Sequence, residues 1–176
     1  IDEAIPLERM VASADGAKKL RVVILDACRD NPFARKMRRE SRAALRRAAA
    51  TYYPQFLQRF REHGLDVYPS TGDHEYGDND WSREKRVLAP AFAEEFARYY
   101  TRTASGAPRF ADRPTGPHAM TAYAWRPHPD VQVVSIDVFD ITRSGAHVRV
   151  DTAQMRWLEG VLEKARRDDV TWIVVQ

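Results

Sequence analysis

The chain has 176 residues, 44% of them hydrophobic and 30% charged, and a formal net charge of +3. This length and composition are typical of one globular domain or two small ones, and no apolar run reaches the roughly 18–20 residues that span a bilayer. The first ten residues, IDEAIPLERM, show no initiator methionine and no signal peptide, which predicts an excerpt of a longer protein. A single cysteine cannot form an internal disulfide, so the sequence leaves the cellular compartment undetermined.

The first fifty residues predict a helix, a buried strand and a basic helix. The first helix ends at Gly16, and the continuous β-branched run LRVVILDA at 20–27 is typical of a strand buried on both faces. A second, Ala/Arg-rich helix is expected at 34–50. Seven Lys or Arg residues stand against one Glu at 35–47, but no aromatic residues are interleaved for base stacking. A solvated helix or a disordered arm is therefore favoured there over contact with nucleic acid or an anionic membrane surface.

The rest of the chain alternates between helical and strand patterns. The expected elements are a helix at 52–64 ending on Gly64, a strand at 65–70, a helix at 82–102 broken near Pro90, a loop at 103–116, strands at 120–126 and 131–141 joined by a turn, a helix at 151–168, and a final buried strand at 170–176. The helix at 151–168 should begin on Asp151 or Thr152 and turn Met155, Leu158, Val161 and Leu162 inward. The order predicts an α/β fold with a mixed sheet flanked by helices.

The chain's only cysteine, Cys28, stands at the end of the first predicted strand, in the sequence RVVILDACRDNPF. A cysteine nucleophile requires a base, usually a histidine, to form its thiolate. The stretch from about 4 to 47 resembles the bacterial caspase-like (metacaspase-related) peptidases. The resemblance implies that Cys28 is the nucleophile and that Asp26 lines a pocket for a basic side chain. No histidine precedes Cys28 in this sequence, so the family's upstream catalytic histidine is missing, and an unreactive buried cysteine is the alternative.

A second motif, Gly72-Asp73-His74-Glu75, follows the predicted strand at 65–70. It resembles the GNH[DE] signature of calcineurin-like metallophosphoesterases, which use two divalent metals to hold a hydroxide against phosphorus. The resemblance implies a tight turn at Gly72, metal ligation by Asp73, a general-acid role for His74 and a supporting role for Glu75. The family has Asn where this chain has Asp73, which adds one negative charge at the metal. A solvated acidic loop is the alternative.

The resemblance to metallophosphoesterases extends over about 51–176. The family continues after its GNH loop with strands resembling TAYAWR and VQVVSIDVFDI, a helix resembling DTAQMRWLEGVLEKAR and a strand resembling VTWIVVQ. It implies the C-terminal half of an αββα sandwich, to whose edge the strand at 20–27 could add. It also implies a divalent metal pair of the Mn, Fe, Zn or Mg class and a phosphate-ester substrate, either a small molecule or a phosphoprotein. Trp157 and Leu158 are expected in the core, Asp137 is expected to be structural, and His118, His128 and His147 are expected at the surface.

The two resemblances divide the chain into a caspase-like fragment at 1–47 and a metallophosphoesterase fragment at 48–176. Fragments that abut in this way predict a chimera, formed by a natural fusion or an artificial join. Neither the DxH nor the GDxxD motif of the phosphoesterases precedes Gly72, and the later metal-binding histidines are not present. We therefore expect a metal-dependent phosphoesterase that is weak or inactive in this chain. The alternatives are a caspase-like cysteine peptidase that cleaves after basic residues and a non-catalytic α/β scaffold.

Overall fold

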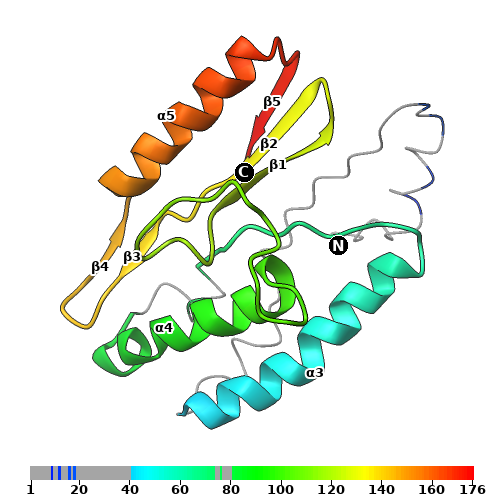
Figure 1. Ribbon diagram of the computed structural model, residues 1–176. Helices are drawn as coiled ribbons and strands as arrows, with labels where there is room; N and C mark the ends of the chain where they lie inside the picture. Colours follow the sequence, from blue (N-terminus) through cyan, green and yellow to red (C-terminus); the bar gives the residue numbers. More distant parts are fainter. Residues whose placement is uncertain are drawn as a thin grey trace, which may run out of the picture.

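The computed structural model describes residues 41–73, 76 and 81–176, together with the single positions 9, 12, 16 and 18. Within these residues the protein has a mixed α/β fold, in which three α-helices accompany a three-stranded mixed sheet and a separate two-stranded hairpin (Figure 1). The expected α/β class is confirmed at this level. No helix in the described part of the chain is both long and apolar enough to cross a membrane.

The first described helix, α3, runs without interruption from Arg42 to Arg61. It begins at the N-cap Ser41, whose hydroxyl accepts a hydrogen bond from the Ala44 backbone N–H at 3.2 Å. The expectation of two separate helices here is wrong, because a single buried face continues through the supposed boundary, on Leu45, Ala49 and Tyr53. This packing outweighs the helix-breaking tendency of the exposed Pro54.

Gly64 ends this helix as the sequence predicted. Its backbone has a φ of 68°, a conformation that a residue with a Cβ adopts only at a cost. The chain reverses at this point, where the N–H of Leu65 donates to the carbonyl of Phe60 at 3.0 Å.

Helix α4 extends from Arg83 to Phe96 and passes into the π-helical turn η1, Ala97–Thr101. The predicted break near Pro90 is wrong, because α4 continues through this exposed residue. The change in winding comes instead after Phe96, where the N–H of Arg102 donates to the carbonyl of Ala97 at 2.8 Å, five residues back. Phe96 and Tyr100 pack there against Ala49 and Tyr53 of α3, and this cluster joins the two helical elements.

The main sheet has the strand order β1-β2-β5. Strands β1 (Tyr123–His128) and β2 (Val131–Ser135) form an antiparallel hairpin, as the sequence predicted, and β5 (Trp172–Val175) lies parallel to β2. Helix α5 (Thr152–Arg167) makes the connection to β5. The expected single strand at 131–141 is instead divided, because the chain leaves the main sheet after Ser135. It then pairs as β3 (Phe139–Ile141) with β4 (Ala146–Val148).

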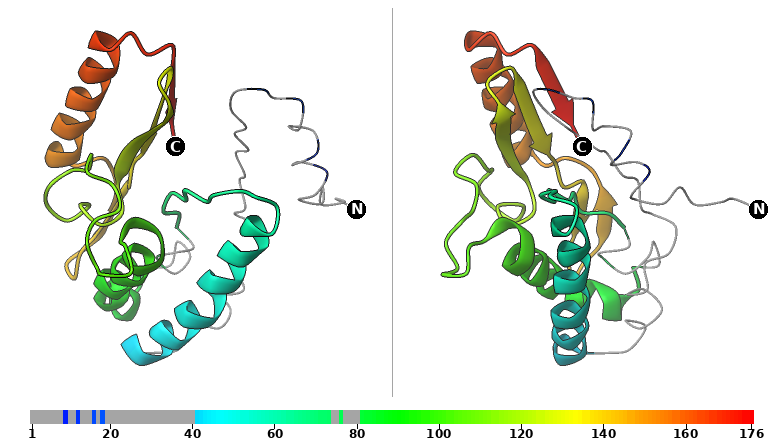
Figure 2. Two further views of the ribbon diagram at one scale, coloured as in Figure 1. Left: turned by 45° about the vertical axis from the view of Figure 1, so that its right-hand side comes forward. Right: turned by 90° about the vertical axis from the view of Figure 1, so that its right-hand side faces the viewer.

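Helix α5 covers one face of the sheet (Figure 2). Val161 packs there against Ala124 of β1 and Val134 of β2, and Trp157 and Leu158 join the cluster as expected. The predicted inward position of Met155 is wrong, because its side chain is 40% exposed. The buried positions of α5 are Gln154, Val161 and Ala165.

Aromatic stacking fixes further parts of the chain to β1. The ring of Tyr68 stacks on Trp125 with 4.5 Å between centroids, and Phe110 stacks on Tyr123 at 4.2 Å. The residues at 65–70 do not form the predicted strand. They run as an irregular segment, held by the Tyr68 ring and by side-chain hydrogen bonds in place of a backbone ladder.

The final strand also differs from the prediction. Trp172 is 67% exposed, Ile173 44% and Val175 49%, although the sequence predicted a buried strand. In the described part of the sheet, β5 is an edge strand with β2 as its neighbour. Its apolar composition is typical of a strand whose two faces are both covered.

Candidate functional site

The candidate site is the loop that carries the GDHE motif, and three hydrogen bonds hold its approach against the main sheet. Gln176, next after β5, donates its side-chain amide to the carbonyl of Tyr68 at 2.9 Å. The phenol of Tyr123 donates to the carbonyl of Pro69 at 2.7 Å, and the hydroxyls of Ser70 and Ser135 lie 3.0 Å apart. Because Ser135 ends β2 and Gln176 follows β5, the loop starts at the carboxyl ends of two parallel strands. Ligand-binding loops of open α/β sheets occupy this edge.

Directly after this anchor, Asp73 and Tyr76 are both turn positions. Gly72 and Asp73 are half-buried, and the N–H of Tyr76 donates to the carbonyl of Asp73 at 3.1 Å. The ring of Tyr76 is buried, and its hydroxyl donates to a carboxylate oxygen of Asp137 at 2.8 Å. His74 and Glu75 lie outside the described residues. The loop is therefore held at two places. Ser70 contacts Ser135 at the end of β2, and Tyr76 contacts Asp137, which lies two residues after Ser135.

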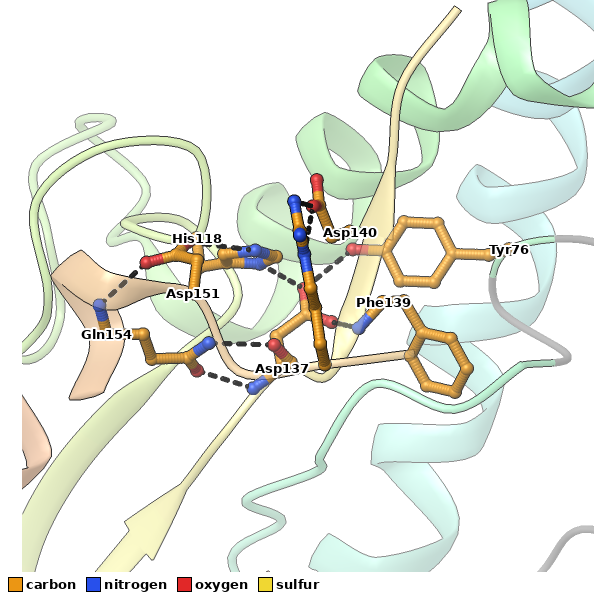
Figure 3. Close-up of polar contacts among 8 residues, drawn as sticks. Tyr76, His118, Asp137, Phe139, Asp140, Asp151 and Gln154 are labelled. Atoms are coloured by element: carbon orange, nitrogen blue, oxygen red, sulfur yellow. Dashed lines mark hydrogen bonds and ion pairs between the residues drawn. The ribbon is translucent and has the colours of Figure 1, made fainter. Parts of the chain in front are cut away.

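Asp137 is the centre of a buried polar cluster (Figure 3). Its two carboxylate oxygens have different partners: Oδ1 accepts from the N–H of Phe139 at 3.0 Å, and Oδ2 accepts from the Tyr76 hydroxyl. The same Oδ2 lies 3.2 Å from Nδ1 of His118. Burial alone would raise the pKa of Asp137, but the hydrogen bonds from His118 and Phe139 and the charge of His118 lower it below its ordinary value.

His118 lies between two carboxylates. Its Nδ1 faces Asp137, and its Nε2 lies 3.2 Å from Oδ2 of Asp151 (Figure 3). The expectation of a surface histidine is wrong, because His118 is 4% exposed. Burial opposes protonation of the ring, yet the hydrogen bond to Asp137 and the charges of Asp137 and Asp151 outweigh it, so the pKa of His118 is raised. A protonated imidazole, with a donor on each nitrogen, matches these two partners.

Asp151 and Gln154 attach the start of α5 to the same cluster. Asp151 is the N-cap and accepts a hydrogen bond from the backbone N–H of Gln154 at 2.8 Å. The side-chain amide of Gln154 then bonds the backbone of Asp137 twice: its Oε1 accepts from the N–H and its Nε2 donates to the carbonyl, both at 2.8 Å. The sequence contained one signal for this pair, because Asp-x-x-Gln before an apolar run has the form of a capping box.

The described residues do not fit a metal pair. Among them, no group of three or more His, Cys, Asp or Glu residues is arranged to hold a metal ion. Both nitrogens of His118 face carboxylates, so this ring has no lone pair directed at a cation. Asp73 is the single residue of the expected ligand set within the described part of the chain.

The other residues singled out from the sequence fall into two groups. Cys28 and Asp26, like His74 and Glu75, lie outside the described residues, so the cysteine-peptidase interpretation stays a prediction. His147 is exposed, as expected, and His128 is partly exposed beside Asp130, with Nδ1 3.4 Å from the carboxylate. Neither of these two histidines lies in the Asp137 cluster.

We expect Tyr76→Phe to release the GDHE loop from the core. The substitution keeps the ring contacts with Phe92 and Phe139 but removes the hydrogen bond to Asp137. A hydrogen bond to a charged group contributes about 1.5–3 kcal/mol, and the free energy of unfolding should fall by about that amount in urea titrations. Tyr99→Phe, which removes a phenol from η1, serves as a control. An equal loss in both variants would contradict a specific role for the Tyr76 hydroxyl.

The fold and the site together define a mixed α/β protein with a polar loop at the carboxyl edge of its sheet. Comparison with family models, with curated proteins and with solved structures found no match to this chain.

Proposed function

We propose that this chain contributes the GDHE loop of a phosphate-ester hydrolase of the calcineurin-like metallophosphoesterase type. In this proposal, Asp73 supplies a carboxylate ligand to a divalent cation and His74 donates a proton to the leaving oxygen of the ester. Gly72 allows the turn that presents both side chains. When bound, the cation would polarise the phosphoryl group and lower the pKa of a bound water.

The placement of the loop is the observation that carries this proposal. Hydrogen bonds at Tyr68, Pro69 and Ser70 hold the approach against β1, β2 and β5, and the Tyr76 hydroxyl fixes its far side to Asp137. The motif is thus attached at both ends to the carboxyl edge of a parallel strand pair. A solvated acidic loop would not require a buried tyrosine immediately after the motif.

The same arrangement predicts weak cation binding and a low rate of ester hydrolysis. One carboxylate is a poor site for a divalent cation, whose affinity depends on the number of charged ligands. Asp73 and His74 alone would leave the cation weakly bound, and we expect slow hydrolysis of a simple ester such as p-nitrophenyl phosphate. The activity should depend on added Mn²⁺, because the proton donor has little effect on an ester that is not polarised.

Paramagnetic broadening by Mn²⁺ in NMR spectra of the full chain tests the ligand assignment. Signals of Gly72, Asp73 and Tyr76 should broaden first, and Asp73→Ala should abolish the effect. Asp66→Ala is the matched control, because it removes an exposed carboxylate from the segment that approaches the loop. Broadening that is centred elsewhere, or that is unchanged in Asp73→Ala, would overturn the proposal.

The proton-donor assignment is tested by His74→Ala. General acid catalysis contributes about 10²–10⁴-fold, so the Mn²⁺-dependent rate should fall by at least about a hundredfold while the broadening at Gly72 persists. His147→Ala, which removes an exposed histidine from β4, should leave the rate unchanged. A His74→Ala rate equal to that of the unsubstituted chain would exclude His74 as the acid.

A further inference from the structure

A cavity of about 350 Å³ opens beside the π-helical turn η1, at the point where the helix ends and a loop begins. Such turns are rare and frequently occur at functional sites. The cavity is lined by Glu94, Arg98, Arg102, Thr103, Ala104 and Gly106. None of these residues belongs to the Asp137 cluster or to the anchors of the GDHE loop, so the cavity is a separate candidate site.

Backbone hydrogen bonds hold the loop that forms one wall of this cavity. The N–H of Thr103 donates to the carbonyl of Ala107 at 2.8 Å. The N–H of Arg109 donates to the carbonyl of Thr101, at the end of η1, at 2.7 Å. The wall is therefore a closed loop tied to η1, which fixes the backbone at Arg102 before any ligand binds.

The two arginines of the cavity have different partners. Nε of Arg98 lies 3.4 Å from the carboxylate of Glu95, which is 2% exposed. Within the described residues, no further ion pair or hydrogen bond engages the two terminal nitrogens of Arg98. Arg102 donates from one terminal nitrogen to the sulfur of Met120 at 3.2 Å, and a thioether is a weak acceptor. Both guanidinium groups therefore keep N–H donors for a ligand.

Arg102 carries the unbalanced charge of this cavity. Glu94 also lines it, but the carboxylate of Glu94 lies 3.4 Å from the guanidinium of Arg46 on α3. Arg46 lies 3.3 Å from Glu95 as well. Arg46 and Arg98 thus neutralise the two glutamates, which leaves the charge of Arg102 without a counterion among these residues. An anion that enters the cavity would supply that counterion.

We propose that this cavity binds a phosphorylated small molecule, whose phosphate group lies between Arg98 and Arg102. Guanidinium groups bind phosphate through paired N–H donors. A tetrahedral phosphate presents oxygens to two arginines at once, whereas a carboxylate has only two oxygens to share between them. The volume of the cavity lies at the lower end of the range of about 300–1,000 Å³ that small-molecule sites occupy, which leaves room for a group attached to the phosphate.

A titration of the full chain with inorganic phosphate, followed by NMR at constant ionic strength and without added Mn²⁺, tests the site. The backbone amides of Arg98, Arg102 and Gly106 should shift saturably. Arg102→Gln should weaken binding at least about tenfold, because it removes the charged donor that has no counterion. Arg102→Lys keeps the charge but loses the planar fork, so it should recover only part of the affinity. The matched control Arg113→Gln removes another exposed arginine and should leave the dissociation constant unchanged.

Further measurements separate this site from the GDHE loop and from a general affinity for anions. Asp73→Ala should retain phosphate binding, and phenylphosphonate, which carries an attached ring and no ester bond, should bind more tightly than phosphate. Shifts that centre on Gly72 and vanish in Asp73→Ala would overturn the proposal, as would equal affinities of the original chain and Arg102→Gln. Acetate that binds as tightly as phosphate would exclude phosphate recognition. Equal affinities for phosphate and phenylphosphonate would exclude the larger ligand.

Discussion

Replacing His118 with leucine is expected to lower the free energy of unfolding by about 3–5 kcal/mol, the usual loss when one partner of a buried ion pair is removed. The leucine side chain fills similar space but leaves the carboxylates of Asp137 and Asp151 without the imidazole between them. Asp137 would keep its hydrogen bonds from Tyr76 and Phe139, but it would remain a buried charge without a cation. Urea unfolding at pH 6 measures the loss.

The size of this loss should depend on pH in a defined direction. The pKa of His118 is raised in the folded state, so its contribution to stability is complete below its ordinary pKa, near 6.5, and is lost as the pH rises through the folded value. The pKa of Asp137 is lowered, so its contribution is present above its ordinary pKa and is lost as the pH falls through the lower folded value. The cluster should therefore stabilise the protein most in mildly acidic solution.

The free energy of unfolding, measured from pH 5 to 9, tests this direction of the pH dependence. The difference between the original chain and His118→Leu should be largest near pH 6 and should shrink as the original chain loses the imidazolium at higher pH. Histidine 128 is the matched control: His128→Leu alters a partly exposed ring beside Asp130 and should change stability by less than about 0.5 kcal/mol. A loss in His118→Leu that is constant over this range would show that the imidazole acts through packing alone.

Gln154→Leu should be comparably damaging for a different reason. The Gln154 amide satisfies both backbone groups of Asp137, at the point where the chain leaves β2 for β3. Leucine at this position would leave a buried N–H and a buried C=O without partners. Each unsatisfied group costs about 1–3 kcal/mol, so the expected destabilisation is about 2–6 kcal/mol.

A matched substitution separates this effect from a change in helix propensity. Gln58→Leu alters an exposed glutamine of α3 whose amide contacts Glu62, and it should cost less than about 0.5 kcal/mol. Leucine and glutamine have similar helix propensities, so the difference between the two variants reports the buried hydrogen bonds. Equal unfolding free energies for the two variants would contradict the role assigned to Gln154.

Local patterns in the sequence were sufficient for several elements of the fold. The β1–β2 hairpin, the Asp151 cap of α5 and the turn at Gly64 were all predicted and are confirmed, because short-range apolar periodicity, caps and glycine conformation report on neighbouring residues. Pro90 was misleading. It suggested a break, whereas packing of the buried face keeps α4 continuous through this residue.

The exposed β5 and the divided strand at 131–141 show a second limit of local patterns. An apolar run indicates that both faces of a strand are covered, but it does not say which elements cover them or whether the described residues supply those elements. Similarly, the run from Val131 to Ile141 contains no glycine or proline at the position where the chain leaves β2. The departure coincides with Asp137, whose backbone bonds to Gln154 instead of to a strand.

The sequence by itself determined the mixed α/β class, the helical character of the segments that form α3, α4 and α5, and the motif Gly72–Glu75 as a candidate site, because these are carried by neighbouring residues. The tertiary structure alone brought Tyr76, His118, Asp137 and Gln154 together, from positions as far apart as 76 and 154. Sequence reasoning placed His118 at the surface, because a histidine in a Gly/Pro-rich loop has no local pattern that marks it as buried. The raised pKa of its imidazole and its structural role arise from two carboxylates that only the fold places beside it.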